Sequence, residues 1–209
     1  MSSEIEVKLM LPDKFILDKI TKDEFLSRYI KDDPIIRETY SEYYDTPDWV
    51  LEKHGYILRV RRTDNVSVAA LKFGRIDNVE FPGLFNGHQW LCLFNSTETI
   101  ISDLIERTAP EEILQIVGDK KLSVCFQSEY VRKYTTLYLP DRVRLELSLD
   151  DGRLICENKS EPLYELGLEL LYGNMAALMN FSTQLMEHFG LQPTLLTKQQ
   201  RALRLIRSR

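Results

Sequence analysis

The sequence predicts a single domain, residues 1–209, of the α+β class and mostly β, in which strands close into a tunnel-like barrel with helices packed on its outside. Its 209 residues suit one such barrel. Apolar residues make up 44% and charged residues 28%, which is typical of a globular protein with a real core. Several strand-like segments alternate ionisable with aliphatic residues, so each predicted strand has one charged and one apolar face.

The first third of the chain predicts strand, helix and strand in that order. Residues 3–10 alternate at a period of two and form a strand, and the apolar spacing from Asp13 to about Ile30 indicates an amphipathic helix. Residues 38–62 indicate strand, turn, short helix and strand. In this segment Asp45 or Thr46 can cap a helix with Pro47 in its first turn, and Gly55 can end that helix.

The rest of the chain adds more strands and a few helices. Strands are expected over 66–74 and around 78–81, and the stretch 81–94 has loop residues at Pro82, Gly83, Asn86 and Gly87 before another apolar strand. Further predictions are helices over 98–117 broken at Pro110, a β region over 122–171 with turns at Pro140–Asp141 and Asp151–Gly152, a helix over 174–190 ended by Gly190, and a final helix that starts with a Thr197–Gln200 capping box.

The charged faces of the strands indicate where a ligand would bind. A sheet face exposed to water is the ordinary explanation for any one of them. However, the helices need an apolar surface to cover, so the aliphatic faces point outward to them and barrel closure puts the charges inside. Clusters of Arg and Lys suit polyphosphate oxygens, and carboxylates suit Mg²⁺ or Mn²⁺. These faces comprise Glu4, Glu6 and Lys8; Arg59 and Arg61; Arg142, Arg144, Glu146, Ser148 and Asp150; and Glu165 and Glu169.

Composition argues against several other functions. The net charge of -5 and the pI of about 5.4 disfavour binding to nucleic acid or to an anionic membrane. The N-terminus shows no signal peptide and no stretch of eighteen apolar residues occurs, so we expect a cytoplasmic protein. The three cysteines and three histidines are scattered, which disfavours a disulfide framework, a zinc site or histidine-based catalysis.

An ordered set of motifs resembles the CYTH superfamily, the triphosphate tunnel metalloenzymes. The resemblance covers residues 3–206 and rests on EIEVK, YYDTPDWVLEKHGYILRVRR, ALKFG, LELSLDDG, ELGLEL and TKQQRALRL, in family order. It implies an antiparallel eight-stranded tunnel. The resemblance also implies that phosphate oxygens are bound by Lys8, Arg59, Arg61, Lys72, Arg132, Arg144, Lys198 and Arg201, and that the metal side consists of Glu4, Glu6, Glu146, Asp150, Glu165 and Glu169.

Three positions depart from the family pattern. Asn78 stands where an arginine is usual, and Tyr134 stands where the strand after the middle helices has its second basic residue. Gly167 replaces the middle glutamate of the ExExEL strand, so water would have to replace a metal ligand. These departures put catalytic activity in question.

The resemblance implies metal-assisted hydrolysis of a phosphoanhydride, with Mg²⁺ or Mn²⁺ as cofactor and with Glu6, Glu169 and Lys72 as catalytic residues. Inorganic tripolyphosphate is the first choice of substrate, since the LRxR, ELxLELL and TKxxR segments look most like bacterial inorganic triphosphatases, here without their CHAD domain. Thiamine triphosphatase and class IV adenylyl cyclase, which acts on a nucleoside triphosphate, are the enzymatic alternatives. A non-catalytic polyphosphate or nucleotide sensor, and a plain domain with a solvated sheet, are alternatives of other classes, and a homodimer stays open.

Overall fold

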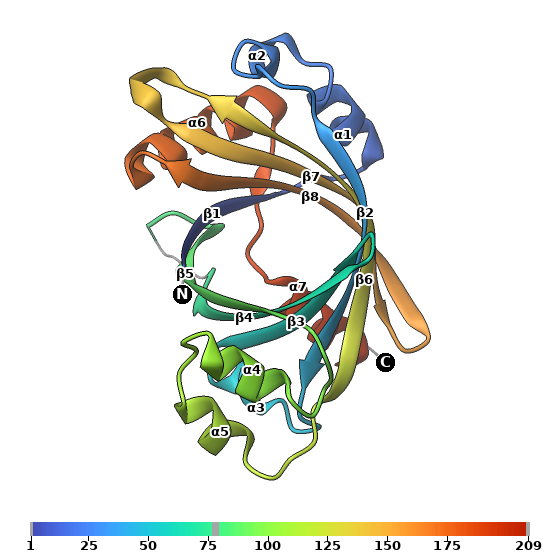
Figure 1. Ribbon diagram of the computed structural model, residues 1–209. Coiled ribbons are helices and arrows are strands. Elements are labelled where there is room, and N and C mark those ends of the chain that lie inside the picture. Colours follow the sequence, from blue (N-terminus) through green and yellow to red (C-terminus); the bar gives the residue numbers. More distant parts are fainter. Residues whose placement is uncertain (1, 77–79, 208–209) are drawn as a thin grey trace.

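Antiparallel pairing joins the strands of the computed structural model into one closed barrel (Figure 1). The structure describes residues 2–76 and 80–207. The strand order is β5-β4-β3-β2-β6-β7-β8-β1, and pairing of β1 with β5 closes the circle, while the short β9 adds to β1. The strands are β1 (Ser2–Met10), β2 (Ile35–Asp45), β3 (Tyr56–Thr63), β4 (Val66–Arg75), β5 (Leu84–Leu93), β6 (Ser123–Tyr138), β7 (Arg144–Cys156), β8 (Lys159–Tyr172) and β9 (Gln192–Pro193).

Helices cover the barrel from outside, in two groups on opposite sides (Figure 1). One group contains α1, α2 and α6, and the other contains α3, α4 and α5. Over residues 2–76 and 80–207, no helix is both long and apolar enough to span a membrane. The helices are α1 (Lys14–Ile20), α2 (Glu24–Ser27), α3 (Val50–Lys53), α4 (Ile100–Glu106), α5 (Glu112–Val117), α6 (Met175–Phe189) and α7 (Lys198–Arg207), with a 3-10 turn, η1, at Pro140–Arg142.

The apolar faces of the strands meet these helices, as strand alternation predicts. Leu147 of β7 and Leu168 of β8 pack with Leu178 of α6 in one buried cluster. Leu71 of β4 packs with Leu104 of α4 in a second cluster on the opposite side. Since neighbours along a strand point to opposite faces, the charged residues between these leucines face the barrel interior. The predicted fold class, a mostly β barrel with external helices, is confirmed.

The C-terminal helix α7 lies at one end of the barrel. Its Ala202 belongs to a third buried cluster, together with Tyr43, Phe126, Tyr130 and Leu154. These four partners come from β2, β6 and β7 and share the strand faces that carry the tunnel charges. The interior therefore changes from charged to apolar where α7 packs.

Polar side chains cap the N-termini of α3 and α7 at the positions predicted from the sequence. Asp45 accepts hydrogen bonds from the backbone N–H groups of Leu51 and Glu52, and Thr46 Oγ1 accepts one from Val50. Both residues therefore satisfy the free amides at the start of α3. Pro47 precedes this helix instead of lying in its first turn. The Thr197–Gln200 capping box is confirmed, because each side chain accepts from the other residue's backbone N–H.

The turn predicted at Asp151–Gly152 is wrong. Strand β7 continues through both residues to Cys156 and turns after it. Gly152 is required by packing, since a Cβ there would lie 2.0 Å from the carbonyl oxygen of Glu129 and 2.5 Å from the Cα of Tyr130 on β6. The glycine thus permits close approach of two strands, which single-sequence patterns do not separate from a turn.

Three other expectations need correction. The helix expected from Asp13 to Ile30 is two helices, because Asp23 caps a new one by accepting from the backbone N–H of Phe25. The loop residues Asn86 and Gly87 lie inside β5. Of the strand expected around 78–81, residues 77–79 lie outside the described residues and 80–81 are not strand. The break in the 98–117 helix and the turn at Pro140–Asp141 are confirmed.

Candidate active site in the barrel tunnel

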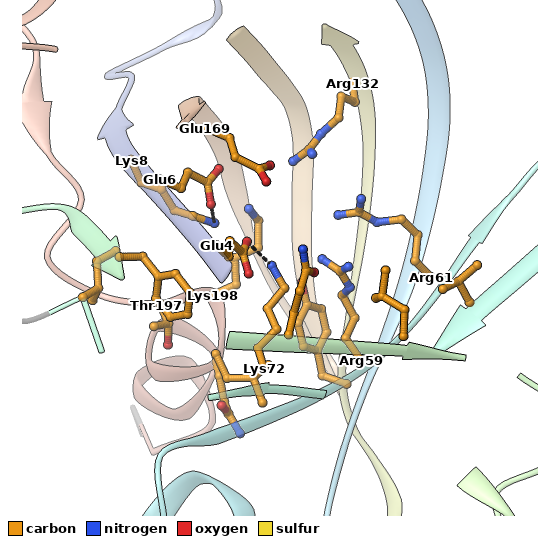
Figure 2. A pocket seen from close by; sticks show the side chains of 18 of the residues that line it. Glu4, Glu6, Lys8, Arg59, Arg61, Lys72, Arg132, Glu169, Thr197 and Lys198 are labelled. Carbon is orange, nitrogen blue, oxygen red and sulfur yellow. Dashed lines mark hydrogen bonds and ion pairs between the residues drawn. The ribbon is translucent and has the colours of Figure 1, made fainter. Parts of the chain in front are cut away.

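The barrel encloses a cavity of about 370 Å³ that is lined by charged side chains of both signs (Figure 2). The lining comes from all eight barrel strands, β1 to β8, and from α7, so no single segment of the chain contains it. Most of the predicted site residues lie here: Glu4, Glu6 and Lys8 from β1, Arg59 and Arg61 from β3, Lys72 from β4, Arg132 from β6, Glu146 from β7, Glu169 from β8 and Lys198 from α7.

The β3–β4 side of the cavity is basic. Arg59 and Arg61 point into the interior because they alternate with the buried Leu58 and Val60 of the outward face. Within the part of the chain that the structure describes, neither arginine has a carboxylate within ion-pair distance, and the Nε atoms of both are buried without a hydrogen-bond partner. Both guanidinium groups therefore keep unused donors for the anionic oxygens of a ligand, although Nη2 of Arg61 donates to the hydroxyl of Tyr130 at 2.8 Å.

Lys72 crosses the cavity to β1. Its ammonium group lies 2.5 Å from Glu4 Oε1, and the Glu4 side chain is only 4% exposed. The pKa of Lys72 is lowered to about 8, mainly by burial, which the carboxylate of Glu4 opposes and the cations Arg59 and Lys8 reinforce. A bound anion would be attracted by these neighbouring cations.

The opposite side of the cavity is acidic. Glu6, Glu169 and Glu146 are register partners on β1, β8 and β7, so their carboxylates are adjacent across three neighbouring strands. Burial and the neighbouring carboxylates of Glu6, Glu4 and Glu146 together raise the pKa of Glu169 to about 7. Glu4 Oε2 is buried and has no hydrogen-bond partner in the described part of the chain. Figure 2 shows Glu4, Glu6 and Glu169 opposite the arginines of β3.

Asp150 and Glu165 form ion pairs and are not part of the cavity lining. Arg132 donates to both oxygens of Asp150, at 2.7 and 2.8 Å, and Lys198 lies 3.4 Å from the same carboxylate. Glu165 pairs with Lys198 and, at 3.8 Å, with Lys8. Arg132 and Lys198 hold the pKa of Asp150 well below its usual range although burial opposes them. Both carboxylates thus hold basic side chains in place, whereas the sequence assigned them to the metal side.

The structure does not bring Arg144 or Arg201 into the cavity. Arg144 is exposed at the end of β7, with its guanidinium carbon 5.7 Å from the ring centroid of Tyr138. A register shift between Arg144 and Leu145 separates it from the charged face of that strand. Arg201 is held outside, where its Nε lies 2.7 Å from Glu161.

Two of the three departures from the family pattern, Tyr134 and Gly167, lie within the described residues. Tyr134 does not line the cavity, and its hydroxyl accepts from Arg37 at 3.3 Å. Gly167 faces the acidic side, because a Cβ there would lie 2.6 Å from Glu6 Oε1 and 2.7 Å from Ser148 Oγ. Asn78 lies outside the described residues.

Sequence reasoning missed several residues at the site. Tyr43, Gln89, Thr197 and Gln199 also line the cavity, and Tyr130 lies directly behind the basic lining. Alternation could have found Tyr130, because it lies two residues before Arg132 on the same strand face. No local pattern identifies Gln89, because its place opposite Lys72 follows from the pairing of β4 with β5.

A divalent metal ion would find suitable donor atoms on the acidic side. Carboxylate oxygens are the donors that Mg²⁺ and Mn²⁺ prefer. Among the described residues Glu4 Oε2 has no hydrogen-bond partner, and Glu6, Glu169 and Glu146 place three further carboxylates side by side. Within residues 2–76 and 80–207, no three Asp, Glu, His or Cys side chains are arranged to hold an ion by themselves. Water and phosphate oxygens would have to complete the coordination.

Comparison with known proteins finds a family and relatives that match most of the chain. The CYTH domain family matches residues 2–201. Inorganic triphosphatase of Haemophilus influenzae is 24% identical over 186 residues, which cover 87% of this chain but 49% of that protein, so the chain spans about half of its length.

Solved structures share the fold at low identity. A Hippeastrum protein described as having a dominant triphosphatase activity has a TM-score of 0.65 at 15% identity and covers 96% of this chain and 95% of its own. The RNA triphosphatase domain of a mimivirus mRNA capping enzyme has a TM-score of 0.56 at 11% identity, with 90% and 88% covered. At these identities the likeness shows the fold alone.

Proposed function

The chain belongs to the CYTH domain family, and on this premise we propose that it hydrolyses a phosphoanhydride bond of a triphosphate inside its barrel, with Mg²⁺ or Mn²⁺. The observation that carries the proposal is the division of the cavity into a basic and an acidic side. Arg59, Arg61 and Lys72 stand on one side, and Glu6 and Glu169 face them from the other (Figure 2).

Inorganic tripolyphosphate is the substrate that we favour. A bare polyphosphate offers oxygens along its whole length, and cations enter this cavity from several directions. The relative from Haemophilus influenzae, named as an inorganic triphosphatase, supports the same choice. The basic residues of the lining are Lys8, Arg59, Arg61, Lys72, Arg132 and Lys198.

The basic residues would bind and orient the substrate. Arg59 and Arg61, which have no carboxylate partner among the described residues, are the strongest candidates for charge-assisted bonds to phosphate oxygens. Arg132 is held in place by two hydrogen bonds to Asp150, which does not line the cavity, so its position is set before the substrate binds. Such preorganised cations stabilise the negative charge of a transferring phosphoryl group without rearrangement during the reaction.

The acidic residues Glu6, Glu146 and Glu169 would hold the metal together with phosphate oxygens. When bound, a divalent cation neutralises phosphate charge and makes a nearby water more acidic. The closed barrel keeps these carboxylates opposite the cations, so the reacting phosphate would lie between the two sides and bulk water would have limited access to it.

The direct test measures phosphate release by the purified protein from tripolyphosphate, thiamine triphosphate and ATP, each with Mg²⁺ or Mn²⁺, with cyclic AMP assayed in parallel. We expect metal-dependent release that is fastest with tripolyphosphate. Faster phosphate release from thiamine triphosphate would make that compound the preferred substrate instead of tripolyphosphate. Formation of cyclic AMP would make ATP the substrate and the protein a cyclase. Binding of tripolyphosphate without hydrolysis under any metal condition would refute the enzyme and favour a polyphosphate sensor.

A further inference from the structure

Tyr130 connects the basic side of the cavity to the apolar cluster under α7. Its side chain is 4% exposed, and its ring packs in the buried cluster that contains Leu154 and Ala202. Its hydroxyl points the other way and lies 2.8 Å from Nη2 of Arg61. Tyr130 therefore packs its ring in the core while its hydroxyl accepts a hydrogen bond from a cation of the tunnel.

The same ring lies close to two further cations. The guanidinium carbon of Arg132 is 5.5 Å from the ring centroid, and Nζ of Lys198 is 5.7 Å from it. Both distances are within the range of cation–π attraction. Tyr130 thus touches basic residues from three elements, namely β3, β6 and α7.

The three cations differ in their other partners. Arg132 and Lys198 are both paired with Asp150, whereas Arg61 has no carboxylate within ion-pair distance among the described residues. Among residues 2–76 and 80–207 its buried Nε has no partner, and the hydroxyl of Tyr130 accepts a hydrogen bond from its Nη2. We take this hydrogen bond to orient the guanidinium group. The hydroxyl oxygen of Tyr130 orients Arg61 without placing a carboxylate beside the positive charge that a phosphate would need.

We propose that Tyr130 is a positioning residue that orients Arg61, and through it the basic side of the tunnel, for binding the anionic oxygens of the substrate. The inference rests on the proposed function, since it assigns Tyr130 to the same site. It goes beyond that function because Tyr130 is not part of the cavity lining and acts only through the arginine.

The test is a double-mutant cycle on tripolyphosphate affinity, measured by calorimetry. Tyr130→Phe keeps the ring in the core and beside Arg132 and Lys198 but removes the acceptor for Arg61. Kd should rise roughly three- to tenfold, less than for the loss of a charge-assisted bond to phosphate, because Arg61 keeps its charge and loses only its orientation. Arg61→Ala should weaken binding more. If the tyrosine acts through the arginine, adding Tyr130→Phe to Arg61→Ala should change Kd by less than about twofold.

Tyr44→Phe is the matched control. Tyr44 is also a buried tyrosine with a hydrogen-bonded hydroxyl, 3.0 Å from Glu42, but it packs in the second cluster outside the barrel. It should leave Kd unchanged. Additive effects in the cycle, or an unchanged Kd in a folded Tyr130→Phe protein, would overturn the inference.

The outcomes separate this inference from the proposed function. Wild-type protein that binds tripolyphosphate but fails the cycle refutes the role of Tyr130 alone, whereas wild type that neither binds nor hydrolyses any triphosphate refutes both. If Tyr130→Phe does not fold, Arg61→Lys tests the same link, because it keeps the charge and loses the planar group that Tyr130 orients. Its Kd should rise to a similar degree, and an unchanged Kd would overturn the inference.

Discussion

Replacing Lys72 with methionine tests whether the basic side of the tunnel binds substrate or only pairs with acids of the protein. The methionine keeps most of the side-chain length and removes the charge. If the ammonium group makes one charge-assisted bond to a phosphate, its loss costs about 1.5–3 kcal/mol of binding free energy. Since about 1.4 kcal/mol corresponds to a tenfold change, Kd for tripolyphosphate should rise roughly 10- to 150-fold.

The structure predicts a second effect that must be separated from the first. Lys72 is the partner of Glu4, whose other carboxylate oxygen is already unpartnered, so Lys72→Met leaves a buried charge unpaired. Breaking such a pair lowers the free energy of unfolding by about 3–5 kcal/mol. In the double variant Glu4→Gln/Lys72→Met the orphaned charge is gone, so stability should largely return while Kd stays high.

The assay is calorimetric Kd for tripolyphosphate beside the melting temperature of each variant at pH 7. Lys133→Met is the control, because Lys133 neighbours Arg132 on β6 but lies on the opposite, outward face of the strand. It should change neither Kd nor turnover. A Lys72→Met protein with a lower Tm and an unchanged Kd would show that Lys72 serves only its ion pair with Glu4, and the division of the tunnel into two sides would lose its support.

Three further predictions concern the carboxylates and Gly167. Glu169→Gln keeps the shape of the acidic side but removes one of its charges. Turnover should fall roughly 100-fold or more while Kd for tripolyphosphate stays within a few-fold of wild type, and higher Mn²⁺ should restore part of the rate. An equal loss of affinity and turnover would contradict separate roles for the two sides. Asp150→Asn leaves the buried Arg132 without its carboxylate partner, while Lys198 keeps Glu165, and should lower stability by about 3–5 kcal/mol at pH 7. Because the pKa of Asp150 is depressed in the folded protein, its stabilisation is present above the unfolded pKa of about 4 and is lost as pH falls toward the folded pKa. The Tm difference between this variant and wild type should therefore shrink between pH 5 and pH 3. A constant difference would argue against the ion pair as its source. Gly167→Glu adds a carboxylate in contact with Glu6, so Tm without metal should fall and Mn²⁺ should restore part of that loss. Gly167→Gln should show no metal-dependent recovery of Tm. Equal behaviour of the two variants would argue against a metal on this side.

Alternation along the strands determined the faces of the barrel before any tertiary information. Glu6 and Lys8, or Arg59 and Arg61, had to share a face because side chains two apart in a strand point the same way. Helices with apolar stripes then required the aliphatic faces, which left the charges for the interior. The local caps of α3 and α7 were likewise predictable, because a cap involves residues a few positions apart.

Only the tertiary structure decided which charges meet. Alternation places Asp150 and Glu146 on one face of β7, but the order and register of neighbouring strands put Asp150 against Arg132 and Glu146 beside Glu169. The same contacts across strands make Gly152 a close-packing residue instead of a turn and bring the hydroxyl of Tyr130 to Arg61. The sequence by itself determined the period of each strand and therefore its faces. Contacts between strands distant in the chain depend on barrel closure, which no single segment encodes.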